Sequence, residues 1–224
     1  MTYSTTFPST ENPISEGGVW RNGLAQGLVW NNVKTVGGTP GSAMATVFND
    51  VTTDDSICVY NGFSSNKHSV SCTVHKDGAY TPPSSHEIEI LVAFSINANS
   101  APGYEIDIGF ASSLQPIRQN GAITDFDTTV FTDISGGPFA VNDADVIRVD
   151  FDSTSGSPVF TIWQNGVQQY KFTDTTAGKI LSGSCGMGFF VRSGAGADFT
   201  KYCWNSFSAT DQSGFPRLPL LGVG

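Results

Sequence analysis

Two acidic residues, Glu105 and Asp107, are the ones whose type and spacing point most directly to chemistry. On an extended strand their side chains lie on one face, about two residues' rise apart. Glycoside hydrolysis uses two such carboxylates, one of which protonates the leaving oxygen. The same strand offers no carboxylate for that second role, and a neighbouring strand would have to supply it through Glu89 or Asp150. Glu105 and Asp107 are the catalytic candidates if the chain is an enzyme, but the incomplete set favours a non-catalytic protein.

Aspartate pairs are candidates for calcium binding. Ca²⁺ takes about six to eight oxygen ligands, and none of the pairs has the spacing of an EF-hand loop. Asp143 and Asp145 fall in an expected loop and are the better, though weak, candidates. No other cofactor is expected. The histidines have no metal or catalytic motif around them and are expected at the surface or at strand edges; they are His68, His75 and His86.

Trp163 is the aromatic residue best placed to contact a sugar ring. It adjoins the Asn165-Gly166 turn, where a side chain at the rim of a sandwich is expected to be exposed. The candidate glycan-binding residues are therefore Trp163, Glu105, Asp107 and Arg148. The alternative is that all four tryptophans are buried, as most tryptophans are.

The four cysteines fit no zinc pattern. Cys58 and Cys72 flank one expected turn, and Cys185 and Cys203 flank another, so each pair could face across a hairpin and form a disulfide if oxidised. The alternative is four reduced, buried thiols, which we favour because the N-terminus has no signal peptide.

The carboxylates belong to the most regular stretch of the chain. Apolar residues occupy every second position of 86–97 and again of 103–110, and the acidic residues fall between them. Strict alternation predicts strands with one buried face. The polar link between the two runs contains proline and glycine, so the runs should form an antiparallel hairpin.

Further short strands, separated by turn residues, are expected on both sides of this hairpin in the sequence. The Asn165-Gly166 dipeptide predicts a type I′ hairpin. Neither helical periodicity nor an internal repeat is present, and this pattern predicts an all-β, two-sheet antiparallel sandwich of the jelly-roll type. The strands are expected at 28–36, 43–48, 56–60, 68–75, 128–134, 145–152, 159–164, 167–172, 184–192 and 201–210.

Three regions differ in composition. Residues 1–41 are turn-rich and are expected to wrap the sandwich, whereas residues 42–211 form the jelly roll. Residues 212–224 form an extended, proline-containing, apolar tail, which packs on its own domain, frays, or holds a neighbouring subunit. The candidate assembly residues of the tail are Phe215, Leu218, Leu220 and Leu221.

Composition limits the partners. The 224 residues carry a formal net charge of −9, which argues against nucleic acid because phosphate contacts need lysine and arginine. No stretch reads as a signal peptide or as a membrane span. We therefore expect cytoplasmic synthesis followed by release on lysis, either in a virion or as an extracellular protein, with no membrane partner.

Three stretches together resemble the concanavalin A-like lectin and glucanase superfamily in its laminin-G-like branch. They are the 103–110 strand, the hairpin around Asn165-Gly166, and the two closing strands with Gly186-Met-Gly-Phe-Phe190 and Trp204-Asn-Ser-Phe. The resemblance covers roughly residues 15–211 and implies a curved jelly roll that binds or cleaves glycans. In laminarinase-type members it implies a Glu-x-Asp-x-Glu motif, of which Glu105 and Asp107 match the first two carboxylates while Gly109 stands at the third.

The leading hypothesis is thus a non-catalytic recognition or assembly protein, such as a phage capsid decoration or tail-associated component that self-associates or binds other virion subunits. The alternatives are a free-standing carbohydrate-binding domain and a glycanase with a degenerate motif.

Overall fold

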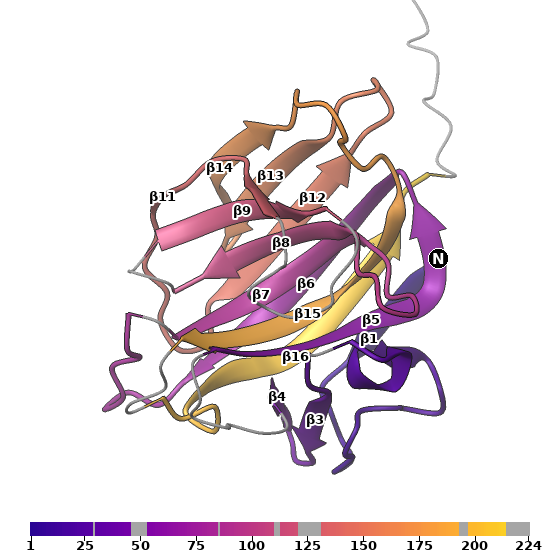
Figure 1. The fold of residues 1–224 in the computed structure, drawn as a ribbon. Helices are drawn as coiled ribbons and strands as arrows, with labels where there is room; N and C mark the ends of the chain where they lie inside the picture. Colours follow the sequence, from indigo (N-terminus) through magenta and orange to yellow (C-terminus); the bar gives the residue numbers. More distant parts are fainter. Residues whose placement is uncertain are drawn as a thin grey trace, which may run out of the picture.

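Two antiparallel sheets packed face to face form the molecule, as Figure 1 shows. The computed structural model describes residues 1–28, 30–45, 53–84, 86–109, 113–120, 131–192 and 197–213. The predicted all-β jelly-roll sandwich is confirmed. Among the described residues no helix has the length and apolar character needed to cross a bilayer.

The back sheet runs, from edge to edge, through β14 (Val167–Thr173), β13 (Val159–Gln164), β12 (Val146–Asp152), β6 (Lys67–Lys76), β16 (Tyr202–Asp211), β4 (Ser42–Ala45) and β3 (Val33–Val36), and β1 (Thr2–Thr5) also pairs with β16. The front sheet runs through β10 (Phe131–Asp133), β9 (Ser113–Gln119), β8 (Gly103–Ile108), β7 (His86–Phe94), β15 (Gly183–Arg192), β5 (Thr53–Ser65) and β2 (Trp20–Asn22), and β11 (Gly137–Pro138) pairs with β9. A short 3₁₀ turn, η1, spans Leu24–Gln26.

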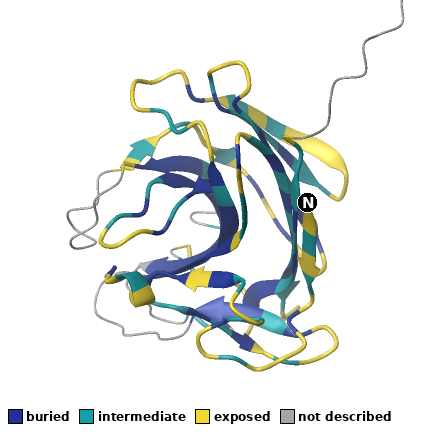
Figure 2. Ribbon diagram, turned by 90° about the vertical axis from the view of Figure 1, so that its right-hand side faces the viewer, coloured by how far each residue is buried: buried dark blue, intermediate teal, exposed yellow. Residues whose placement is uncertain are grey.

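Alternate residues of both sheets point inward and form the main core. Among them are Val70, Cys72, Ile88, Ile90, Ile106, Ile147, Val149, Met187 and Phe189, all with no exposed surface. The front sheet is curved, and its hollow side faces away from the back sheet (Figure 2).

The hairpin of β7 and β8 is confirmed, with Ile88 opposite Ile108 and Val92 opposite Tyr104. The expectation that only one face is buried is wrong, because every residue of both strands is buried. On the outer face, Leu91 packs into a second apolar cluster with Trp30 and residues of β5. The N-terminal region therefore covers part of the outer face, which the acidic residues were expected to leave open to solvent.

The N-terminal region also supplies strands to both sheets. β1 pairs with β16 in the back sheet, and β2 pairs with β5 in the front sheet. β9 was likewise not expected from the sequence, and it contains Pro116. β10 lies opposite residues 117–119 and β11 opposite residues 113–114, so Pro116 falls between the two short pairings, where its carbonyl accepts a hydrogen bond from the backbone N–H of Ile134.

The expectation that the histidines lie at the surface or at strand edges is wrong for two of them. His68 and His86 have no exposed surface, and burial lowers the pKa of each to about 4. The ring of His68 stacks on Phe151, and His86 packs edge-on against Phe199. Both act as neutral core residues. His75 does lie at the surface, with Nδ1 3.3 Å from an oxygen of Asp143.

The predicted turn is confirmed, whereas neither cysteine pair faces across a hairpin, because β5 and β15 belong to the front sheet and β6 and β16 to the back sheet. Asn165 and Gly166 both adopt positive φ, of 51° and 78°, and join β13 to β14. The four cysteines are free and buried. The proposed assembly residues of the tail, Phe215, Leu218, Leu220 and Leu221, lie outside the described residues.

Candidate functional site

A group of buried carboxylates lies on the outer, hollow face of the front sheet. Register places Glu89 of β7 directly opposite Asp107 of β8, and Glu105 lies two residues further along β8. Carboxylate oxygens of the three residues lie within 4.8 Å of one another. We call this group the carboxylate cluster. Glu89 is the neighbouring-strand carboxylate that the sequence offered, whereas Asp150 lies on the back sheet.

The cluster is nearly inaccessible to water. Glu89 is 2% exposed, Glu105 3% and Asp107 7%. Burial, reinforced by repulsion among the acidic groups, raises the pKa of Glu89 and of Asp107 far above their ordinary values, and burial raises the pKa of Glu105 to about 7. Among the described residues no lysine or arginine forms an ion pair with any of the three. Within the described residues, no cationic side chain therefore offsets the cost of ionising these carboxyl groups.

Several oxygen atoms of the carboxylate cluster lack a hydrogen-bond partner within the described structure and could bind a cation. Gln119 of β9 donates its amide to Glu105 across 2.7 Å and is itself 4% exposed. Within the described part of the chain, one oxygen of each carboxylate has no hydrogen-bond partner, and neither has Oε1 of Gln119. Carboxylate and amide oxygens in one buried place are the ligands that a hard cation such as Ca²⁺ prefers. The donor set thus fits calcium.

A glycine of β15 makes room for this arrangement. Gly188 lies opposite Glu89, and a Cβ at position 188 would stand 2.0 Å from a Glu89 carboxylate oxygen. Any side chain there must displace the carboxyl group from the cluster.

Substituting Gly188 therefore provides a first prediction. Gly188→Ala should lower the free energy of unfolding by about 1–3 kcal/mol, because it overpacks a filled site. Urea denaturation measures the loss. The double variant Gly188→Ala/Glu89→Ala should be more stable than Gly188→Ala alone, since it removes the atoms in the way; a double variant that is less stable would mean that Glu89 is not what confines position 188.

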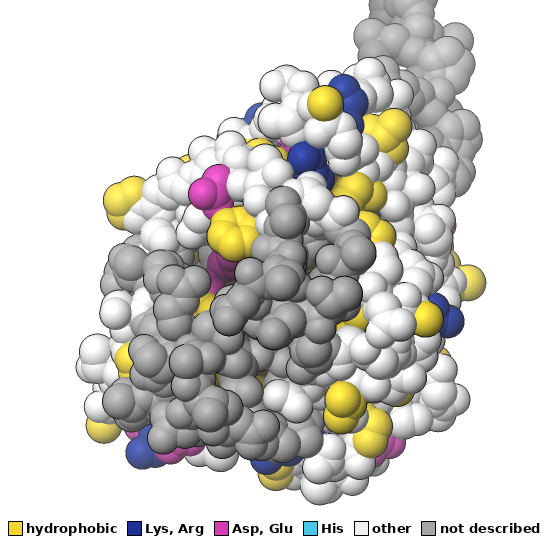
Figure 3. Space-filling view, in the orientation of Figure 1, with side chains coloured by type: hydrophobic (Ala, Val, Ile, Leu, Met, Phe, Trp, Pro, Cys, Tyr) yellow, Lys and Arg dark blue, Asp and Glu magenta, His cyan; other side chains and the backbone are white. Residues whose placement is uncertain are grey.

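The same face carries polar and aromatic side chains toward its β10 edge. Register places Gln115 opposite Asp107, and Phe131 opposite Gln119. Gln115 donates to Asp133 across 2.7 Å, and Phe131 is 48% exposed. Figure 3, which views this side of the molecule, shows apolar and acidic side chains next to one another near β9. An exposed ring beside polar groups is a surface on which a sugar could stack.

The glycan candidates from the sequence fall on opposite sides of the molecule. Glu105 and Asp107 lie on the front sheet, whereas Trp163 and Arg148 face each other on the outer side of the back sheet. Trp163 is half-buried, with the Arg148 guanidinium 4.5 Å from the centre of its ring. The four residues cannot form a single site.

Asp143 and Asp145, the calcium candidates from the sequence, stabilise a turn through hydrogen bonds. Asp145 accepts hydrogen bonds of 2.7 Å from the backbone of Asn142 and from the side chains of Gln164 and Asn165. Burial would raise the pKa of Asp145, but these hydrogen bonds outweigh it and lower the pKa. Asp143 accepts from the backbone of Lys76. In the described residues, the acidic groups that converge as ligands are instead those of the carboxylate cluster.

Gln119 and Phe131 were not singled out from the sequence. Gln119 belongs to β9, which was not expected from the sequence, and the place of Phe131 depends on the pairing of β10 with β9. Leu91 and Ala93 were the available signal for a doubly buried strand, because they place apolar residues among the acidic positions of β7.

No family model and no curated protein sequence matches the chain. Solved structures do match in fold. A Bacillus subtilis protein of unknown function with a galectin-like fold has a TM-score of 0.58 at 10% identity, over 93% of this chain and 94% of that one. The VIP36 exoplasmic/lumenal domain in its Ca²⁺/Man3GlcNAc-bound form has a TM-score of 0.54 at 10% identity, over 91% and 90%. A Lotus tetragonolobus seed lectin has a TM-score of 0.53 at 10% identity, over 96% and 100%.

The class of fold is thus the lectin-like jelly roll. This confirms the resemblance to the concanavalin A-like sandwich that the hairpin and the closing strands indicated. At such low identity the likeness concerns the fold, and function has to be argued from the site.

Proposed function

We propose that this chain is a non-catalytic, carbohydrate-binding domain that holds Ca²⁺ in the carboxylate cluster and binds a glycan on the hollow face of the front sheet. The observation that carries the proposal is the convergence of Glu89, Glu105 and Asp107 with unpartnered oxygens and no cationic side chain in the described structure. A bound Ca²⁺ would neutralise the carboxylates and fix the strands that present the glycan-binding surface. VIP36, whose domain shares this fold, has been solved with both Ca²⁺ and Man3GlcNAc.

The cluster suits an ion better than a sugar substrate. Hydrolysis requires the two carboxyls to flank the scissile bond, with a sugar ring between them. Here all three carboxylates are less than 8% exposed and lie against one another, so a sugar ring does not fit between them. The glycanase hypothesis is therefore the weaker one, and a sugar is expected beside the cluster, over Gln115 and Phe131.

A glycan array probed with and without a chelator tests the proposal. Binding should require Ca²⁺, and the best-bound glycan should then lose about fivefold in affinity for Phe131→Ala, because stacking on an exposed ring contributes about 1 kcal/mol. Val167→Ala is the matched control, since Val167 is an exposed apolar residue on the back sheet. Glycan binding that persists undiminished in the chelator, or an array without any binding in Ca²⁺, would refute the proposal.

The virion hypothesis rests on the wrapping N-terminal segment, on the expected location after lysis and on the apolar tail, most of which lies outside the described residues. Glycan binding has a specific site to support it, so it takes precedence as the function to test.

A further inference from the structure

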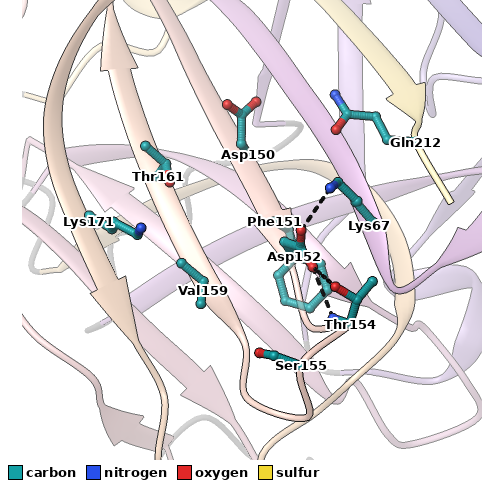
Figure 4. Close-up of a pocket in the computed structure, with 10 residues that line it drawn as sticks. All are labelled: Lys67, Asp150, Phe151, Asp152, Thr154, Ser155, Val159, Thr161, Lys171 and Gln212. Carbon is teal, nitrogen blue, oxygen red and sulfur yellow. Dashed lines mark hydrogen bonds and ion pairs between the residues drawn. The ribbon is translucent and has the colours of Figure 1, made fainter. Parts of the chain in front are cut away.

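A groove on the outer side of the back sheet lies on the opposite face of the sandwich from the carboxylate cluster. It has a volume of about 410 Å³, which falls in the range of ligand pockets. Figure 4 shows its walls, which come from β12, β13, β14 and the adjoining ends of β6 and β16. Its lining contains the partly buried side chain of Val159 and the ring of Phe151, and the other lining groups are polar.

Two ion pairs neutralise the acidic groups of the groove. Asp152 pairs with Lys67 at 2.9 Å, and Asp150 pairs with Arg148 at 3.1 Å. Asp150 also accepts from Ser69 at 2.6 Å and from the indole of Trp163 at 2.7 Å. These carboxylates are therefore fixed in place, and they offer little capacity to accept hydrogen bonds from a ligand.

Lys171 is the cationic side chain of the groove that has no acidic partner among the described residues. It is exposed, and in the view of Figure 4 its side chain extends from β14 across β13 and ends between Thr161 and Val159. Within the described part of the chain, neither the Lys171 ammonium nor the Thr161 hydroxyl has a side-chain partner. The groove thus has a surplus positive charge on a protein whose net charge is −9.

The remaining groups suit a polyol. Thr161 and Ser155 carry hydroxyls, and Gln212 donates its amide N–H to Ser69, so that its amide oxygen remains available as an acceptor. Val159 between them provides an apolar floor for C–H groups of a sugar ring. One cation, several neutral hydrogen-bonding groups and a small apolar patch fit a saccharide that carries a carboxylate.

We propose that this groove is a second saccharide site, specific for carboxylated sugars, in which Lys171 binds the carboxylate and Thr161 a ring hydroxyl. The site needs no metal, because its aspartates are already paired with Lys67 and Arg148. A single chain would then have two independent glycan sites on opposite faces, one dependent on calcium and one not.

Calorimetric titration in the presence of a chelator tests the groove separately from the front sheet. A galacturonic acid trimer and sialyllactose represent two sources of the carboxylate, with a galactose trimer and lactose as their neutral counterparts. At least one acidic sugar should bind, and its neutral counterpart should bind at least tenfold more weakly. Lys171→Gln should weaken binding about tenfold and Thr161→Val about fivefold, as expected for a charge-assisted and a neutral hydrogen bond.

Lys34→Gln is the matched control, because it removes the same charge from β3, at the opposite edge of the same sheet. It should leave affinity unchanged. Equal losses in Lys34→Gln and Lys171→Gln would overturn the assignment and indicate a general charge effect. So would equal binding of acidic and neutral sugars, or no binding of either acidic sugar in the chelator. None of these results would bear on calcium-dependent binding at the front sheet.

Discussion

Replacing Asp174 by asparagine is expected to lower the free energy of unfolding by about 3–5 kcal/mol, since it removes one partner of a buried ion pair. Asp174 follows β14 of the back sheet, and its Oδ2 lies 2.8 Å from a guanidinium nitrogen of Arg118 on β9 of the front sheet. Tyr104 also donates to Asp174, across 2.9 Å. The Arg118 side chain is 6% exposed and that of Asp174 0%, so the variant would leave a buried cation without its counter-charge.

Asp198→Asn is the matched control. Asp198 accepts from the backbone and hydroxyl of Thr200 just as Asp174 accepts from those of Thr176, but its ion pair with Lys201 is 3.7 Å long and partly exposed to solvent. Asp198→Asn should therefore lower the free energy of unfolding by less than about 1 kcal/mol. Urea denaturation measures both variants. Equal, small losses would show that the Arg118–Asp174 pair does not join the two sheets energetically.

The double variant Arg118→Met/Asp174→Asn isolates the charge effect. Removing both charges should recover part of the stability lost in Asp174→Asn alone, because the buried cation is gone. A double variant less stable than the single one would mean that packing around the Arg118 side chain, rather than its charge, matters most.

Glu105→Gln is expected to stabilise the cation-free protein at alkaline pH. Burial raises the pKa of Glu105 to about 7 from an ordinary value of 4.5, so the folded chain retains a proton that the unfolded chain has released. Its contribution to stability is fully present below about pH 4.5 and is lost as pH rises through 7. A shift of this size corresponds to about 3 kcal/mol. Glutamine avoids this loss and still offers Gln119 an amide oxygen.

Denaturation of both proteins in a chelator at several pH values provides the measurement. The variant should exceed the wild type by up to about 3 kcal/mol near pH 8.5, and the difference should shrink toward pH 5. His68 and His86, whose lowered pKa values make stability fall as pH drops from about 6.5 to 4, are common to both proteins and cancel. A stability difference that is independent of pH would contradict the proposed burial of an ionisable group.

The sequence predicted the sandwich and its central hairpin because alternation and turn chemistry are local. Ile88 to Phe94 and Tyr104 to Ile108 define their strands without reference to the rest of the chain, and Asn165-Gly166 defines its own turn. Which residues lie opposite one another on neighbouring strands depends instead on contacts between distant parts of the sequence. The proximity of Glu89 to Asp107 depends on the register of β7 with β8, although the two residues were each visible as candidates.

The parts that were missed depend on contacts distant in sequence. Alternation predicted that Glu105 would lie on an exposed face, whereas its side chain is 3% exposed and lies against Glu89, Asp107 and Gln119. Trp163 and Glu105 were grouped as one glycan site by residue type, and they separate because β13 and β8 belong to different sheets. His68 and His86 were misplaced for a related reason, since they pack against the aromatic rings of Phe151 and Phe199.

Calcium titration by isothermal calorimetry tests the central claim most directly. The account predicts that the wild-type protein binds one Ca²⁺ and that Glu105→Gln loses at least about 100-fold in affinity, because a charged ligand is removed from the cluster. Asp143→Asn, which alters the calcium candidate suggested by the sequence, should bind Ca²⁺ as the wild type does. Absence of calcium binding by the wild type, or equal affinity of wild type and Glu105→Gln, would contradict the account.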